Sequence, residues 1–594
     1  MMIIDTLTIN TIEAIRILFG TDVRKEQITI QRTVSAFRDQ GDFSLVVFPF
    51  LKLSRKSPEE TARLIGERLT EKTPEIDSFS VIKGFLNLKL KSEFWTRFLS
   101  QNFGNKLFGI KDTLNEKPIL VEFSSPNTNK PLHLGHIRNN LLGDSISRIL
   151  NANGENVVKV NLVNDRGIHI CKSMLAWKLY GKGVTPESSG IKGDKLVGDF
   201  YVLFDKKYKE ELGELKSQGL NEDEAATKSQ LMADARQLLI KWEQKDPETL
   251  KLWNSMNGWV YKGFDTTYKN LGIEFHKIYY ESETYLLGKE LVKEGLEKGI
   301  LFRKEDNSVW INLTEEGLDE KLLLRSDGTS VYMTQDLGTA ELRYKEFNPE
   351  AMVYVVGNEQ NYHFDVLKLV LKKLGKEWAS SIFHLSYGMV ELPEGKMKSR
   401  EGTVVDADDL IEEMISTARE MTLELGKIED FENEEALNLY RTVGLGALKY
   451  FILKVDPKKN MIFNPAESID FNGNTGPFIQ YTYARIKSIL RKADDLKIGF
   501  DQSIELHPKE TSLIILNSSF PQIIEQAAKE YSPSVIANFI YELAKEYNQF
   551  YHELHILREE SLSKKNLRLA ISLMTASNLK NGLGIMGIDV PERM

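Results

Sequence analysis

The chain has 594 residues, 41% of them hydrophobic and 27% charged, which is the composition of a folded globular protein. This length predicts several domains, and the composition excludes a disordered or fibrous chain. Acidic residues outnumber basic ones, 86 to 77, so the chain as a whole is not a general binder of polyanions. Any surface that binds nucleic acid must therefore be local.

Cysteine content and apolar runs limit the chemistry and the compartment. Cys171 is the single cysteine, so an intramolecular disulfide and a zinc site built from several thiolates are excluded, and we expect a small buried residue there. The first residues include Asp5 and Glu13 and no basic stretch before an apolar core, unlike a signal peptide. No run approaches the ~18 apolar residues of a membrane span. We therefore expect a cytoplasmic protein with no membrane contact.

Residues 1–110 are predicted to form a separate α+β domain. Helix patterns run through 12–18 and 58–69, and residues 79–90 alternate like a pair of strands. This segment holds 16 Lys and Arg against 13 Asp and Glu, a net charge of +3, which leaves −12 on the rest of the chain. Residues 104–115 are expected to be the linker to the next domain.

A βαβ pattern predicts a parallel-sheet domain over 111–407. A short apolar strand (119–123), an amphipathic helix (135–152) and a second strand (157–163) follow one another. Two strands joined in this way by a helix pair in parallel, with a right-handed crossover. A charged helical insertion of about 194–300 then interrupts the domain.

The pattern resumes after the insertion and is followed by helices only. Strands at 351–356 and 382–389 flank a helix at 362–375. A helical connective segment is expected over 408–460 and a bundle over 461–594. The expected helices are 410–425, 434–453, 477–496, 511–531, 534–557 and one near 564–580. The predicted fold class is α/β: a Rossmann-like parallel-sheet domain with an N-terminal α+β domain and a C-terminal all-α helical bundle.

A turn with two histidines follows the strand at 119–123 and opens the helix after it. It reads His133-Leu134-Gly135-His136, and its glycine lets a ligand come close to the backbone between two imidazoles. Ligands of parallel sheets bind at strand ends, and helix N-termini attract phosphate. The pattern predicts phosphate chemistry at this turn; the alternative is two surface histidines at a helix start.

A second motif, Gly-Lys-Met-Lys-Ser-Arg-Glu-Gly, occupies residues 395–402 after the last predicted strand. Lys396, Lys398 and Arg400 place three cations within five positions, which suits a polyphosphate. We expect a loop that binds phosphate groups. A solvated basic loop is the alternative.

Together these motifs resemble the HIGH and KMSKS signatures of the class I aminoacyl-tRNA synthetases. Five segments resemble the arginyl-tRNA synthetases in particular, and the resemblance covers nearly the whole chain: 124–144, 323–343, 354–364, 472–490 and 582–594. The resemblance implies an enzyme that uses ATP, with Mg²⁺, to ligate L-arginine to tRNA(Arg). The reaction runs through an arginyl-adenylate and releases AMP and pyrophosphate. A monomer without a structural zinc or other protein metal site is also implied.

The resemblance assigns an ATP site to the two motifs. Charge develops on phosphate oxygens during adenylate formation, so the site needs cations and hydrogen-bond donors. His133 and His136 stabilise that charge, and Lys396 neutralises the pyrophosphate. The remaining ATP contacts are expected at Gly135, Met397 and Lys398.

One position departs from the class I pattern. Ser399 stands where the second signature lysine belongs. Many arginyl-tRNA synthetases lack that lysine, and a lysine just before the histidines is thought to compensate. Lys130 has that place here, so we expect it to be a catalytic cation; a solvent-exposed loop lysine is the alternative.

The arginine pocket is predicted from the guanidinium group, which needs carboxylates and planar acceptors. Tyr332 and Asp336 are four residues apart and so share a helix face. Glu283 is the alternative to Glu281, two residues away. The family pattern maps the pocket, from the α-amino end onward, to Asn127, Glu281, Tyr332, Asp336 and Gln360.

The resemblance assigns tRNA contacts to both ends of the chain. Residues 1–110 resemble the family's extra domain, which touches the tRNA elbow, and residues 461–594 resemble its anticodon-binding bundle. Aromatic rings stack on unpaired bases. The candidate contacts are Phe478, Tyr481, Phe550, Tyr551 and the terminal Met594. Positions in the core of the bundle are the alternative for the aromatic residues.

Two other functions are open at this point. A class I synthetase for another amino acid is disfavoured, because two carboxylates in the pocket suit a cation and a single cysteine does not support a thiolate zinc site. A non-catalytic RNA-binding paralogue is disfavoured because both histidines and Lys396 are present.

Overall fold

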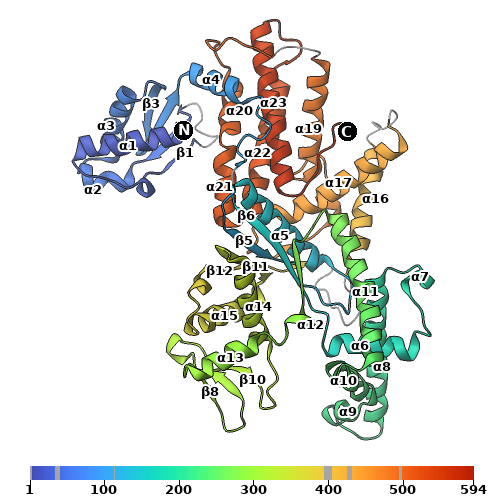
Figure 1. The fold of residues 1–594 in the computed structure, drawn as a ribbon. Helices are drawn as coiled ribbons and strands as arrows, with labels where there is room; N and C mark the ends of the chain where they lie inside the picture. The colour runs from blue at the N-terminus through green and yellow to red at the C-terminus, as the bar shows by residue number, and fades with distance from the viewer. Residues whose placement is uncertain (1–2, 34–39, 113, 394–404, 425–430, 494–497) are drawn as a thin grey trace.

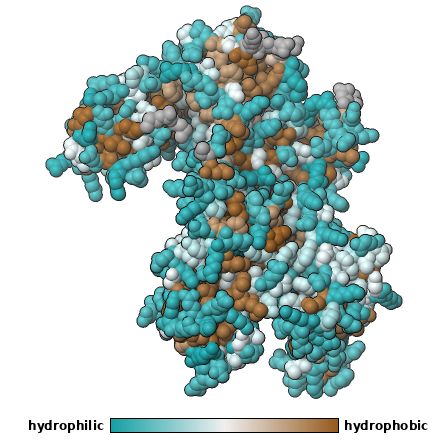
Figure 2. Space-filling model, in the orientation of Figure 1, coloured by the Kyte–Doolittle hydropathy of each residue, from teal (hydrophilic) through white to brown (hydrophobic). Residues whose placement is uncertain are grey.

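The computed structural model describes residues 3–33, 40–112, 114–393, 405–424, 431–493 and 498–594. Figure 1 shows an N-terminal domain beside a C-terminal helical bundle, with a parallel sheet and two lobes below them. Among these residues, no helix is long and apolar enough to cross a membrane. The face shown in Figure 2 is mostly hydrophilic, with its hydrophobic side chains in separate patches.

The N-terminal domain is an antiparallel sheet packed against helices, as predicted. Its strands follow the order β1-β2-β4-β3, and β3 and β4 form the strand pair expected at 79–90. Helix α3 begins at Ser57, whose side chain accepts a hydrogen bond from the Glu60 N–H. The elements are α1 (Ile3–Phe19), β1 (Ile30–Arg32), β2 (Phe43–Val46), α2 (Leu51–Ser54), α3 (Pro58–Lys72), β3 (Ile76–Ile82), β4 (Phe85–Leu90) and α4 (Ser92–Asn102).

The central sheet is parallel throughout, which confirms the α/β prediction. Its order is β12-β11-β5-β6-β7. Strands β6 and β7 are added on one side of β5, and β11 and β12 are added later on its other side. The boundary between β5 and β11 is the switch point at which such sheets bind ligands. The strands are β5 (Pro118–Glu122), β6 (Asn156–Val163), β7 (Lys277–Tyr280), β11 (Ala351–Gly357) and β12 (Ile382–Tyr387).

Two lobes are inserted between strands of this sheet. The prediction that a charged helical insertion reaches about residue 300 is wrong at 277–280, because strand β7 forms the edge of the sheet there. Between β6 and β7 lie α6 (Ile168–Tyr180), α7 (Pro186–Ser189), α8 (Gly193–Ser217), α9 (Glu222–Lys228), α10 (Gln230–Glu243) and α11 (Pro247–Leu271). Between β7 and β11 lie α12 (Glu281–Thr284), α13 (Gly288–Glu297), β8 (Leu301–Arg303), β9 (Val309–Ile311), β10 (Lys321–Leu324) and α14 (Tyr332–Phe347). Helix α15 (Asn361–Lys373) follows β11.

The C-terminal part is helical where it is described, apart from β14 (Met461–Ile462), which pairs with β13 (Val390–Glu391). The single helix expected over 511–531 is wrong, because the chain forms two helices there. Pro521 lies in the first turn of the second, where its missing N–H breaks no hydrogen bond. The helices are α16 (Ala407–Glu424), α17 (Asn433–Leu453), α18 (Pro465–Ser468), α19 (Gly476–Lys492), α20 (Pro508–Ser518), α21 (Phe520–Glu530), α22 (Pro533–Glu553) and α23 (Leu562–Ile585).

Helix α5 (Leu134–Ala152) lies at the centre of the molecule. It contacts the sheet on one side and α16, α17, α21, α22 and α23 on the others. Most of its residues are buried, including Arg138 and Asp144. Gly143 permits the close approach to the sheet, because a Cβ atom there would lie 2.2 Å from Phe123 Cγ. The helix that opens at the histidine turn is therefore also the helix on which the bundle packs.

Candidate active site

The carboxyl ends of the parallel strands meet at one edge of the sheet, and predicted site residues follow them. Asn127 lies in the loop after β5, and Glu281 directly follows β7. Gln360 ends the 3-10 helix η5 (Asn358–Gln360) after β11. The histidine turn ends the loop that holds Asn127. Topology thus brings residues that are far apart in the sequence to the switch point.

The two histidines are held by the first turn of α5. His133 is the N-cap residue, and its Nδ1 accepts a hydrogen bond from the Gly135 N–H at 3.1 Å. His136 Nδ1 accepts from the His133 N–H at 3.2 Å, and the two ring centroids are 4.0 Å apart. Because each Nδ1 accepts, each neutral ring carries its proton on Nε2. That N–H can donate to a ligand.

Both rings are neutral at pH 7. Burial, followed by the positive charge of Lys130, lowers the pKa of His133 to about 3. Burial also holds the pKa of His136 well below its usual value, and His133 and Lys130 add to the shift. The pKa of Lys130 is lowered by its own burial. Neutral imidazoles that do not titrate near pH 7 suit hydrogen bonding to phosphate oxygens rather than proton transfer.

The whole second motif, residues 395–402, lies outside the described residues, and with it the predicted positions Lys396, Met397, Lys398 and Ser399. The chain that follows the motif is described and runs beside the histidine turn. Val405 O accepts from the Leu134 N–H at 3.2 Å, and the Ala407 N–H donates to Leu132 O at 2.9 Å. The described chain on the C-terminal side of the second motif therefore lies against the histidine turn.

Two predicted carboxylates, on α12 and α14, lie close enough to interact. Burial raises the pKa of Glu281 to about 7, with Arg166 opposing the shift and Asp165 and Asp336 adding to it. Asp336 Oδ2 lies 2.6 Å from His363 Nε2. A cation placed between the two carboxylates would relieve their repulsion and favour the ionised form of Glu281. The pair is therefore suited to a guanidinium group.

The other three predicted arginine contacts face solvent. Tyr332 is the first residue of α14 and is 75% exposed. Asn127 and Gln360 are exposed as well. Glu283 is exposed, whereas Glu281 is half-buried among the other charged groups, so the geometry favours Glu281 for the pocket.

Asp165, which was not among the residues predicted from the sequence, holds Glu281 in place. Asp165 is 1% exposed and lies just after β6. Its carboxylate accepts hydrogen bonds from the Ser282 N–H at 2.8 Å, from Ser282 Oγ at 2.7 Å and from the Tyr261 hydroxyl at 3.0 Å. Ser282 is the neighbour of Glu281, so Asp165 ties the start of α12 to the sheet. Its place after a predicted strand was the signal available in the sequence.

Arg166 is a second residue that sequence analysis missed. Its guanidinium lies 4.1 Å from the Tyr285 ring centroid and 5.2 Å from that of Trp242. It also forms an ion pair with Glu243 at 2.9 Å. Arg166 is a fixed positive charge near Glu281, and it partly offsets the negative charge that a substrate would meet.

The backbone at the switch point is strained. Ser124 and Ser125 have φ angles of 78° and 44°, in the left-handed region that residues other than glycine rarely adopt. The Ser124 N–H donates to Asn139 Oδ1 at 2.5 Å, and the Ser125 N–H donates to Asn161 Oδ1 at 3.0 Å. Such conformations cost about 1–3 kcal/mol and persist where the surroundings enforce them, often at binding sites. A serine in a sequence does not indicate a left-handed backbone conformation, so this strain could not be predicted.

The candidate tRNA contacts in the bundle are partly at the surface and partly in the core. Tyr481 and Tyr551 lie on the neighbouring helices α19 and α22, and the Arg485 guanidinium is 4.8 Å from one ring centroid and 5.5 Å from the other. Phe478 is half-buried against the bundle core. Phe550 is fully buried, so the alternative of a core position holds for this residue.

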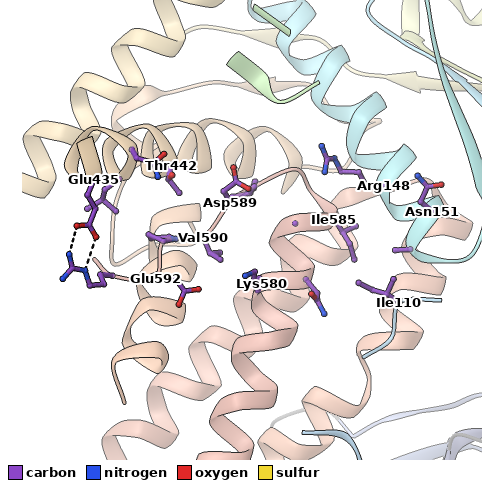
Figure 3. Close-up of a pocket in the computed structure, with 18 of the residues that line it drawn as sticks. Ile110, Arg148, Asn151, Glu435, Thr442, Lys580, Ile585, Asp589, Val590 and Glu592 are labelled. Carbon is purple, nitrogen blue, oxygen red and sulfur yellow. Dashed lines mark hydrogen bonds and ion pairs between the residues drawn. The ribbon is translucent and has the colours of Figure 1, made fainter. Parts of the chain in front are cut away.

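A groove of about 860 Å³ lies at the opposite end of α5 (Figure 3). It is enclosed by α5, α17, α23 and the C-terminal segment 588–593. Arg593 donates to both carboxylate oxygens of Glu435, at 3.1 and 2.6 Å, and Lys449 Nζ donates to Gly587 O at 2.5 Å. Met594 is half-buried next to Arg593. Of the described residues predicted to bind ATP or arginine, none lines this groove.

Residues 99–465 match the family described as tRNA synthetases class I (R), catalytic domain, and residues 479–594 match the DALR anticodon binding domain. The fold and the histidine turn at its switch point define a class I aminoacyl-tRNA synthetase. Arginine–tRNA ligases of Bacteroides thetaiotaomicron and Porphyromonas gingivalis are 58% and 55% identical, over 100% of each chain. The chain belongs to the arginyl-tRNA synthetase family. The fold is similar to that of Thermus thermophilus arginyl-tRNA synthetase, with a TM-score of 0.80 at 23% identity over 99% of this chain and 100% of that one.

Proposed function

We propose that the chain ligates L-arginine to tRNA(Arg) with ATP, through an arginyl-adenylate, and that the switch-point residues carry the reaction. The observation that supports this most is the combination of two neutral histidines with two carboxylates at one edge of the sheet. The histidines suit phosphate oxygens, and the carboxylates suit a guanidinium.

In the first step, a carboxylate oxygen of arginine attacks the α-phosphorus of ATP, and the bond to the bridging oxygen of pyrophosphate breaks. Negative charge grows on the phosphate oxygens. His133 and His136 donate hydrogen bonds to these oxygens through Nε2–H, and Lys130 supplies positive charge. The remaining contacts to ATP and pyrophosphate come from Gly135, Lys396, Met397 and Lys398.

Arginine lies with its guanidinium between Glu281 and Asp336. Asn127 binds the region of its α-amino group, and Tyr332 and Gln360 complete the pocket. Asp165 holds the start of α12, and so keeps Glu281 at the end of β7. This arrangement selects a long cationic side chain, because an uncharged substrate would leave two carboxylates facing each other.

In the second step, a hydroxyl of the terminal ribose of the tRNA attacks the arginyl carbonyl carbon. AMP leaves, and the proton of the hydroxyl is released. Residues 1–110 bind the tRNA elbow, and 461–594 bind the anticodon through Tyr481, Tyr551, Phe478 and Met594. The catalytic domain is 111–407, and 408–460 connects it to the anticodon-binding bundle.

Magnesium enters with ATP. Mg²⁺ is usually bound through substrate phosphates and one or two carboxylates rather than by a cage of protein ligands. Within the described part of the chain, no group of three or more His, Cys, Asp or Glu residues could hold a metal ion. Bound with ATP, Mg²⁺ would neutralise negative charge on the phosphates.

The test is the ATP-dependent attachment of each of the twenty amino acids to total tRNA. ATP–pyrophosphate exchange is measured alongside, with and without tRNA. We expect attachment of arginine alone. Attachment of another amino acid, or tRNA binding without attachment, would contradict the proposal. Light scattering checks the expected monomer.

A further inference from the structure

Arg138 lies two residues after His136 on α5 and is 1% exposed. A buried guanidinium requires hydrogen-bond partners. Its Nη1 donates to Met389 O at 3.1 Å, and its Nη2 donates to Pro457 O at 3.2 Å and to Lys459 O at 2.7 Å. All three acceptors are main-chain carbonyls. Arg138 therefore fixes the course of two chain segments rather than the position of a side chain.

The two segments held by Arg138 also bond to each other. The Gly388 N–H donates to Pro457 O at 2.9 Å, and the Met389 N–H donates to Asn460 Oδ1 at 2.8 Å. A Cβ atom at Gly388 would lie 2.5 Å from the Lys459 carbonyl, so the two chains touch closely. Met389 leads directly into β13, the last strand before residues 394–404, which contain the second signature.

The chain after residues 394–404 reaches the same helix. Val405 forms a backbone hydrogen bond with Leu134, the first residue of α5, and Ala407 forms one with Leu132, just before the helix. Both described flanks of the second signature are thus bonded to the first turns of the helix that carries the two histidines.

We propose that Arg138 is a positioning residue for adenylate formation: it holds the described chain before the second signature, 388–391, and the segment 457–460 against the helix that carries His133 and His136. The inference rests on the proposed function. Arg138 is too deeply buried to touch a substrate, so it acts through the main chain of 388–391 and 457–460. The two carboxylates of the arginine pocket lie on α12 and α14, whereas the hydrogen bonds of Arg138 go to 389, 457 and 459. Loss of Arg138 should therefore slow the chemistry without weakening arginine binding.

The test is ATP–pyrophosphate exchange at saturating tRNA with Arg138→Lys and Arg138→Met. We expect kcat to fall roughly 10- to 100-fold, the effect of losing charged hydrogen bonds. Lysine keeps the charge but not the fork of donors, so its loss should be the smaller one. The arginine KM should change by less than about twofold, because its contacts are not removed.

Two further variants separate positioning from folding. Asn460→Ala removes the hydrogen bond from the Met389 N–H to the exposed Asn460 side chain and leaves no buried charge without a partner. It should lower kcat about three- to tenfold with an unchanged melting temperature. Arg568→Lys alters another buried guanidinium, bonded to Glu510 at 2.8 Å, and should lower the melting temperature without lowering kcat.

The outcomes distinguish the inference from the proposed function. A lower melting temperature with unchanged kcat in the Arg138 variants overturns the inference, and so does a rise in arginine KM that matches the fall in kcat. Absence of arginine-dependent exchange in the parent protein would instead contradict the proposed function, before any variant is compared.

Discussion

The two ends of α5 are built in different ways. At the N-terminal end, His133 and His136 are held by hydrogen bonds within one turn of chain. At the C-terminal end, Arg148 and Asn151 line a groove that is closed by α17, α23 and the C-terminal segment (Figure 3). One helix thus connects the histidine turn, which residues close in the sequence form, to a groove formed by segments that are far apart in the sequence.

The electrostatics of the two ends differ as well. The histidines at the N-terminal end are neutral at pH 7, because burial and Lys130 lower their pKa values. The C-terminal end is held by charges, with Asp144 bonded to Arg148 at 2.6 Å and to Lys159 at 3.0 Å. Substitutions at the first end should therefore change rates, and substitutions at the second should change stability.

The largest effect is expected at the histidines. His136→Ala removes a positioned donor, and losing one such donor costs ~10²–10³ in kcat. The measurement is ATP–pyrophosphate exchange at saturating tRNA. The melting temperature should stay close to that of the parent protein, because the ring lies at the site rather than in the core. A fall in kcat of less than about threefold would remove His136 from the phosphate site.

Lys130 should have the next largest effect. Lys130→Ala removes a charged contact to phosphate worth ~1.5–3 kcal/mol, which lowers the exchange rate roughly 10- to 150-fold. Lys130→Arg keeps the charge and is the matched control, with a smaller loss. Unchanged kinetics in the alanine variant would show that Lys130 does not compensate for Ser399.

Asp336 tests the arginine side of the site. Asp336→Asn removes the charge but keeps the shape, and should raise the arginine KM roughly 10- to 100-fold while leaving the ATP KM nearly unchanged. Glu283→Gln, on the exposed side of α12, is the control and should leave both values as they are. Equal changes in the two KM values would place Asp336 outside the arginine pocket.

The pH dependence of arginine binding should reveal Glu281. The pKa of this carboxyl is raised to about 7 by burial, so lowering the pH through that value protonates it and removes a negative charge from the pocket. Below its pKa, kcat/KM for arginine should fall up to about tenfold per pH unit, because the ionised form binds the cation. Glu281→Gln should be less active but should lack this step. A profile that is the same in both proteins would assign the step to another group.

The smallest effect is expected at the C-terminal end of α5. The Arg593–Glu435 pair is exposed, with side chains 45% and 43% accessible, so Arg593→Ala should cost only ~0.2–1 kcal/mol of stability. Thermal unfolding measures this loss, and the kcat of exchange should not change. A clear fall in kcat would break the comparison, because it would couple the groove to the chemistry at the far end of the helix.

Much of the fold was predictable because its signals are local. Apolar periodicity predicted the strands β5, β6, β11 and β12 and the helix between the first two. The place of the histidine turn at the start of a helix was predicted for the same reason, since one turn of backbone determines it. The break between α20 and α21 at Pro521 could have been predicted from the sequence, because proline in the interior of a helix removes a backbone hydrogen bond.

Other features had no local signature. Strand β7 is four residues long and lies after a long helical insertion, so only its pairing with β6 identifies it as a strand. Phe550 carries the same aromatic ring as an exposed stacking residue, and only packing shows that it is buried. Asp165 is identified as a site residue only by its hydrogen bonds with Ser282 and Tyr261.

The sequence by itself determined the class of the fold, the histidine turn and the family resemblance, because each depends on residues close together in the chain. The tertiary structure decided that Asp336 lies near enough to Glu281 to raise its pKa, that Asp165 holds the start of α12, and that Arg138 joins α5 to the flank of the second signature. The physical reason is that burial and charge interactions depend on which strand ends and helices meet. That meeting is set by the order of strands in the sheet, which no local pattern encodes.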